Sequence, residues 1–325
     1  MALIGITTTI PVELLFASGH VPVDLNNIFI TRQNPLELIE RAEFRGLPRT
    51  LCSWIKGIYG ILCERQDIET VVAVVEGDCS NTLPLLEILR DEGREVIPFS
   101  FPFDRDRHHL EREMEKLTAR FPSEKDALEA WRTRLDAIRR KVHRVDELCW
   151  KEGKVTGLEN HLYLVSSSDF QGEPDSYEKR LDEFIAEASE RKSDFSMVPL
   201  GFVGVPPIFS DFYDFLEEKG AKVIFNEVQR QFSMPGLKEN LVERFLEYTY
   251  PYGLPERIDD IRRETAARGL WGIIHYTQSF CHHQMEHLLL REKLRVPLLL
   301  LEGDRPGGLD ERTKVRLESF LEMLR

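Results

Sequence analysis

Short apolar runs alternate with longer amphipathic stretches along most of this chain. Apolar, β-branched runs predict strands at residues 20–25, 70–77, 95–101, 197–205, 222–228, 272–278 and 296–304. Helical periodicity predicts helices at residues 11–19, 81–92, 210–219, 238–248, 256–268, 281–294 and 310–324. Because strands and helices alternate, the pattern indicates parallel, doubly wound sheets.

The pattern changes between residues 105 and 192. Charged stretches with helical periodicity cover residues 125–153 and 176–191. The expected fold class is therefore α/β, with two small doubly wound parallel-sheet (Rossmann-like) domains and a mainly helical segment between them. The predicted domains are an N-terminal α/β domain (1–104), a helical domain (105–192) and a C-terminal α/β domain (193–325).

Composition narrows the class of protein. The net charge of the 325 residues is −13, which argues against general binding to nucleic acid or to anionic membranes. The N-terminus lacks the basic region of a signal peptide, and no apolar run reaches the roughly 18–20 residues of a membrane span. We therefore expect a cytoplasmic protein. Its five cysteines are an odd number and widely spread, which argues against a disulfide framework.

Three of the cysteines share one local setting. Residues 70–99 and 270–302 each predict a strand, a polar turn, a cysteine, an amphipathic helix and a second strand, and the cysteines are Cys79 and Cys281. Cys52 also precedes a predicted helix. A helix N-terminus stabilises a thiolate, and the carboxyl edge of a parallel sheet is where open α/β folds bind ligands. The spacing supports a shared metal or iron–sulfur site, with three buried apolar cysteines as the alternative. Cys63 and Cys149 are interpreted as core residues or as extra ligands.

Histidines surround the last of these cysteines. His283 to His287 read H-x-x-E-H, a zinc-peptidase pattern, but such peptidases need a further carboxylate ligand downstream, and the remaining residues are assigned to a strand and a terminal helix. We expect Met285, Leu288 and Leu289 to face a core and His283 and His287 to be partly exposed. His282 is a candidate hydrogen-bond donor to whatever Cys281 binds.

Five segments together resemble the 2-hydroxyacyl-CoA dehydratase component family, which includes the benzoyl-CoA reductase subunits and the double-cubane cluster proteins. They are GITTTIPVELLFASGHVPVDL (5–25), LCSWIKGIYG (51–60), EGDCSNT (76–82), SFCHHQMEH (279–287) and LLEGDRPGGLDERTKVRLESFLEML (300–324). The resemblance implies that Cys52, Cys79 and Cys281 ligate one [4Fe–4S] cluster. It makes Glu13, in the first predicted helix, a candidate base or cluster contact. It also makes His282 a candidate catalytic residue.

The resemblance also implies an anaerobic enzyme, a lyase or an acyl-CoA reductase. An ATP-hydrolysing activator would supply a low-potential electron for radical dehydration or reduction of an acyl-CoA substrate. The chain would form a homodimer, or a heterodimer with a related subunit. Two alternatives stay open: a double-cubane-type reductase of small molecules, and a cluster-carrying electron-transfer subunit without catalysis. A double cubane requires about twice the thiolates of a single one, and five cysteines are too few unless another group contributes.

Overall fold

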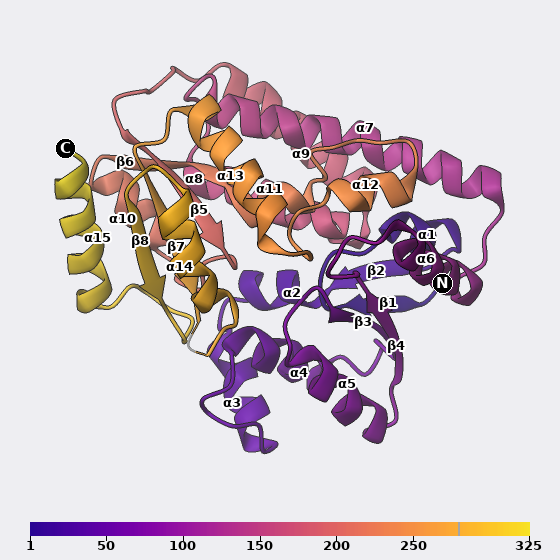
Figure 1. The fold of residues 1–325 in the computed structure, drawn as a ribbon. Helices are drawn as coiled ribbons and strands as arrows, with labels where there is room; N and C mark the ends of the chain where they lie inside the picture. Colours follow the sequence, from indigo (N-terminus) through magenta and orange to yellow (C-terminus); the bar gives the residue numbers. More distant parts are fainter. Residues whose placement is uncertain (279) are drawn as a thin grey trace. The chain divides into compact units, whose positions relative to one another are not determined.

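The computed structural model describes residues 1–278 and 280–325 and contains two four-stranded parallel sheets flanked by helices (Figure 1). Contacts divide the chain into two compact units. The N-terminal unit comprises residues 1–140, 166–178 and 234–253, and the C-terminal unit comprises residues 141–165, 179–233 and 254–325. The α/β class and the two parallel sheets predicted from the sequence are confirmed. The division into three domains stays a prediction.

The sheet of the N-terminal unit has the strand order β2-β1-β3-β4, and all neighbours are parallel. Its strands are β1 (Leu3–Ile6), β2 (Val21–Asp24), β3 (Thr70–Glu76) and β4 (Glu95–Ser100). Residues 71–74 of β3, three valines and an alanine, are buried on both faces, as expected for a central strand of a parallel sheet.

Helices connect and cover these strands. They are α1 (Val12–Ala17), α2 (Leu25–Thr31), α3 (Leu36–Phe44), α4 (Ser53–Glu64), α5 (Thr82–Asp91) and α6 (Arg107–Arg120). The same unit holds the 3-10 helices η1 (Ser166–Ser168) and η2 (Phe170–Gly172), and helix α12 (Leu241–Glu247). Helices α5 and α6 pack on β4, and α4 packs on α2 and α3.

The sheet of the C-terminal unit repeats the topology, with the order β6-β5-β7-β8 and parallel neighbours. Its strands are β5 (Val198–Gly204), β6 (Ala221–Asn226), β7 (Gly272–Thr277) and β8 (Leu298–Glu302). In both sheets, the first strand along the chain is central, and the chain adds strands on one side of it and then on the other. The order therefore reverses beside the first and third strands, where such folds bind ligands.

The helices of the C-terminal unit lie between and after these strands. They are α8 (Gly157–Val165), α10 (Phe212–Glu218), α11 (Glu227–Phe232), α13 (Leu254–Arg268), α14 (His283–Lys293) and α15 (Glu311–Leu324). Two helices, α7 (Lys125–Trp150) and α9 (Pro174–Ser189), contribute residues to both units. Within the described residues, every helix is too short or too polar to cross a lipid bilayer.

Candidate functional site

Cys79 lies in the turn between β3 and α5, at the carboxyl end of a central strand. Gly77 begins this turn with a φ of +91°, and a Cβ there would lie 2.5 Å from the Pro251 carbonyl oxygen. Glycine is therefore required twice, for the left-handed backbone and for the close approach. The Thr82 N–H donates to the Cys79 carbonyl oxygen over 2.9 Å, which joins the turn to the start of α5. The turn holds the partly exposed Cys79 beside a helix N-terminus.

Cys52 is the N-cap residue of α4, with extended backbone angles (φ −49°, ψ 133°). The Lys56 N–H donates to its carbonyl oxygen over 3.1 Å, so the first helical hydrogen bond begins at this cysteine. The rest of the first turn is buried, and the Lys56 ammonium lies 2.8 Å from the Glu43 carboxylate. The sequence-based prediction that Cys52 starts a helix is confirmed, and its partly exposed thiol lies at the positive end of the helix dipole.

Cys281 occupies the corresponding place in the C-terminal unit, after β7 and just before α14. Its N–H donates to the Gln278 carbonyl oxygen, and the Gln284 N–H donates to its own carbonyl oxygen, both over 3.0 Å. Burial raises the pKa of the Cys281 thiol, while a hydrogen bond from the His283 N–H to the sulfur opposes that rise. Cys79 and Cys281 therefore both follow the third strand of their sheet, as the spacing predicted.

Helix α14 is turned the opposite way from the sequence-based expectation. Met285 is 83% exposed and Leu288 is 62% exposed, while the side chain of His283 is buried. The expectation that these apolar residues face a core was wrong. The reason is a buried ion network beneath the helix, which pairs with its polar face.

Arg257 is the centre of that network. Its guanidinium binds the buried Glu227 carboxylate through Nε (2.5 Å) and Nη2 (2.8 Å), and Nη1 lies 2.5 Å from Oε2 of Glu286. The other oxygen of Glu286 lies 2.8 Å from Nδ1 of His283. Burial opposes ionisation of Glu286, but Arg257 and the adjacent histidines outweigh it and lower its pKa to about 2. The polar face of α14 is thus anchored by paired charges.

Two other histidines form a separate pair. Nδ1 of His275, on β7, lies 3.2 Å from Nδ1 of His287, on α14, and the two rings are stacked. Burial lowers the pKa of His275 to about 3, so its imidazole is neutral at physiological pH. His287 therefore contacts the strand, and the atoms grouped at ligand distance come instead from His282, His283 and Glu286. The H-x-x-E-H spacing does not describe that group.

Glu13, the candidate base in α1, lies fully buried in an ion network of the N-terminal unit. Its Oε1 accepts from Nη1 of Arg139 (2.6 Å) and Nη1 of Arg244 (3.1 Å). Arg244 also donates to Asp136 through Nη2 over 2.7 Å. Burial alone would raise the pKa of Glu13, but the two guanidinium groups lower it. A carboxylate held ionised by two arginines is a weak proton acceptor, so these contacts indicate a structural role.

The remaining two cysteines differ in exposure. Cys63 lies in the last turn of α4 and is partly exposed, and burial and the Glu92 carboxylate raise the pKa of its thiol. Cys149 lies in α7 and is buried, and burial raises its pKa to about 12. Because a thiolate is the ligating form, the environment of Cys149 suits an apolar core residue better than a ligand.

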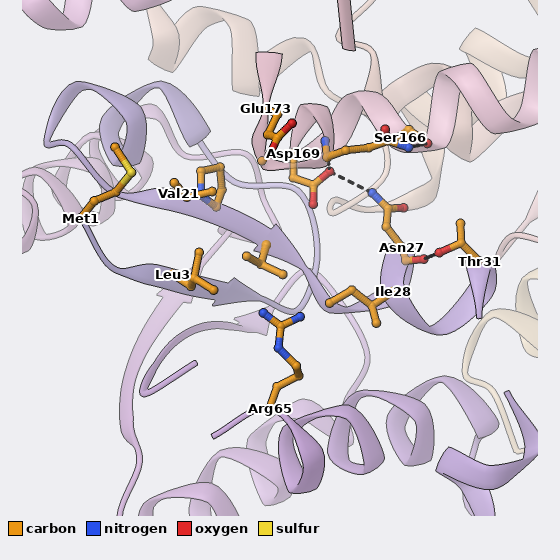
Figure 2. Close-up of a pocket in the computed structure, with 14 residues that line it drawn as sticks. Met1, Leu3, Val21, Asn27, Ile28, Thr31, Arg65, Ser166, Asp169 and Glu173 are labelled. Atoms are coloured by element: carbon orange, nitrogen blue, oxygen red, sulfur yellow. Dashed lines mark hydrogen bonds between the residues drawn. The ribbon is translucent and has the colours of Figure 1, made fainter. Parts of the chain in front are cut away.

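A pocket of about 560 Å³ in the N-terminal unit was not anticipated from the sequence (Figure 2). Its wall includes Asp169, whose Oδ2 accepts from the Asp24 N–H over 2.7 Å and whose Oδ1 accepts from Asn27 over 3.1 Å. Gln171 also lines the pocket, and it and the preceding buried residue, Phe170, have positive φ angles of 55° and 53°. Such strained backbone is often found beside binding sites. Asp24, at the end of β2, does not line the pocket but contacts Asp169 in its wall, and a polar residue at a strand end was a sequence signal that could have indicated a site here.

Asp24 and Asp169 form a buried pair of carboxyl groups. The Ser168 hydroxyl donates to Oδ2 of Asp24 over 2.6 Å. Burial raises the pKa of both acids, and the neighbouring Asp24 charge contributes to raising that of Asp169 to about 7. One of the two groups therefore retains its proton well above the usual range for aspartic acid.

The sequence matches the family described as 2-hydroxyglutaryl-CoA dehydratase, D-component, over residues 7–324. The chain belongs to this family. No curated protein matches the chain closely enough to count as a relative. The family points to a component of a dehydratase-like enzyme, and its description as a D-component implies that other components act with it. The matched range includes Cys52 and Cys79 of the N-terminal unit and Cys281 of the C-terminal unit. That the three sulfurs meet on one cofactor stays a prediction.

Proposed function

We propose that this protein is the iron–sulfur component of a 2-hydroxyacyl-CoA dehydratase-like enzyme, with Cys52, Cys79 and Cys281 as ligands of a [4Fe–4S] cluster. The observation that supports it most is the repeated position of two cysteines. Cys79 follows β3 and Cys281 follows β7, each the third strand of a sheet with the same strand order. Both lie within the range that matches the dehydratase family.

The chemistry of these three residues fits such a cofactor. Each is a partly exposed cysteine close to the N-terminus of a helix. Backbone N–H groups and the helix dipole stabilise the thiolate form that binds iron. With three thiolates as ligands, one iron of a cubane would have no cysteine ligand and would be open to water or a substrate oxygen.

Held by Cys52, Cys79 and Cys281, such a cluster would supply low-potential one-electron chemistry for radical dehydration or reduction of an acyl-CoA, with an ATP-hydrolysing activator as the electron donor. The protein's own contribution is to hold the thiolates in turns fixed by backbone hydrogen bonds. At Cys281, partial burial also limits access of water to the sulfur. Oxygen-sensitive chemistry of this kind fits an anaerobic, cytoplasmic setting, with a related subunit completing the assembly.

Iron binding tests the proposal directly. Protein reconstituted anaerobically with iron and sulfide should be brown and contain about four irons per chain. Cys79→Ala and Cys281→Ala should each lose most of the iron and the visible absorbance, because each removes a ligand from a turn. Cys149→Ala is the matched control and should keep both, because that thiol is buried in α7. A colourless wild-type protein, or full iron in Cys79→Ala, would contradict the proposal.

The same preparation distinguishes the two alternatives. About eight irons per chain, falling by half in Cys63→Ala, would favour a double cubane. For a single cubane, a change in the cluster spectrum on addition of an acyl-CoA supports a catalytic subunit. An unchanged spectrum across several CoA esters supports an electron carrier.

A further inference from the structure

The first turn of α14 and the residue before it bring three potential metal ligands together. One ligand atom from each of His282, His283 and Glu286 lies within 4.8 Å of the other two. The two imidazole rings are neighbours, with centroids 4.0 Å apart, and Nδ1 of His283 lies 2.8 Å from Oε1 of Glu286. All three residues belong to one short segment of the C-terminal unit, so a local turn is sufficient to form the group.

The charges behind these ligands favour a cation. Arg257 is paired with Glu227 through two contacts and with Glu286 through a third. One guanidinium against two carboxylates leaves a formal net charge of −1 beside the two imidazoles. Because Glu286 binds Arg257 through Oε2, its Oε1 is held toward His283. Fixing a ligand's orientation through its second atom is a common feature of metal sites in proteins.

We propose that His282, His283 and Glu286 form a binding site for a divalent transition-metal ion such as Zn²⁺ or Fe²⁺. Two imidazole nitrogens and one carboxylate oxygen are a ligand set typical of these ions, and it leaves coordination positions open for water or a substrate oxygen. Hard ions such as Mg²⁺ and Ca²⁺ prefer all-oxygen sites and are disfavoured here. The site uses no cysteine, so it is independent of the proposed cluster.

The test uses full-length protein freed of metal with a chelator and titrated with Co²⁺, a spectroscopic substitute for Zn²⁺. The histidine–carboxylate site should bind one ion per chain, with ligand-field bands that persist in Cys281→Ser. A cobalt–thiolate charge-transfer absorption in the wild type would report ions at the cysteines proposed as cluster ligands, not at this site. His282→Ala and Glu286→Gln should each weaken binding at least about tenfold. His282→Ala is the decisive variant, since His282 is exposed and its removal leaves the Arg257 network intact.

Two controls lie on the same segment. His287→Ala should bind Co²⁺ as tightly as the wild type, because His287 contacts His275 instead. Cys281→Ser should also keep its Co²⁺ affinity while losing the iron–sulfur cluster, which separates the two proposals. The metal site is refuted if wild-type protein takes up no stoichiometric Co²⁺, if His282→Ala binds with wild-type affinity, or if Cys281→Ser abolishes binding.

Discussion

The buried Asp24–Asp169 pair predicts that the stability of this protein depends on pH around neutrality. Both carboxyl groups have a raised pKa in the folded state, and that of Asp169 is about 7, against 3.8 for an ordinary aspartic acid. Between these pH values the folded state binds more protons than the unfolded state. The contribution of the pair to the free energy of unfolding is therefore greatest below about pH 4. It decreases as the pH rises and is lost above about pH 7.

The magnitude follows from the shift. At about 1.4 kcal/mol for each pKa unit, the change at Asp169 corresponds to an upper limit on the order of 4 kcal/mol. Asp24→Asn removes one of the two charges with little other change. Its side-chain oxygen can still accept from the Asn26 N–H, as Oδ1 of Asp24 does over 2.9 Å, and its new amide can donate to the Ser168 hydroxyl oxygen.

The assay is urea unfolding of wild type and Asp24→Asn at pH 5 and pH 8. The wild type should lose more stability than the variant over this interval, by about 1 kcal/mol or more, because only the wild type must hold two buried, ionised carboxylates near each other. Comparing the two proteins cancels the contribution of every other titrating group. An equal loss of stability in both proteins, or a larger loss in Asp24→Asn, would refute the reasoning.

Three further predictions concern the frame around the candidate sites. Arg244→Met should lower the free energy of unfolding by about 3–5 kcal/mol, because it leaves the buried carboxylates of Glu13 and Asp136 with too few partners. The control, Arg140→Met, changes an exposed position of α7 and should have little effect in the same urea assay. Gly77→Ala should lower the thermal unfolding midpoint more than Gly93→Ala. Both glycines have positive φ, but only at Gly77 would the added Cβ lie against the Pro251 backbone. Equal shifts in the midpoint would contradict this steric argument. Leu288→Gln, at an exposed position of α14, should change the free energy of unfolding by less than about 0.5 kcal/mol. Leu290→Gln, at a buried position, should lower it by about 2 kcal/mol or more. The reverse order would show that α14 is oriented as its sequence suggested.

Strand and helix positions could be predicted from the sequence where periodicity was strong. The predicted strand at residues 70–77 corresponds to β3, and the predicted helix at 81–92 corresponds to α5. The short β1 was not predicted, because four residues beside a threonine-rich turn carry little periodicity.

Contacts between residues far apart in the chain could not be predicted from the sequence. Nothing local indicates that Asp24 meets Asp169, which is 145 residues away. The orientation of α14 was wrong for the same reason. Its apolar residues suggested a core, but a buried arginine on α13 and a glutamate on α11 determine which face is inside. The positions of Cys52, Cys79 and Cys281 at helix starts were predictable because they depend on neighbouring residues alone.

The two units are interleaved along the chain. Membership changes between residues 140 and 141, 165 and 166, 178 and 179, 233 and 234, and 253 and 254. No single cut can therefore separate them, and a fragment designed to isolate either half would lack some of its own segments or carry unpaired pieces of the other. During synthesis on the ribosome, the first sheet can form early, but its unit cannot be completed until residue 253 has emerged.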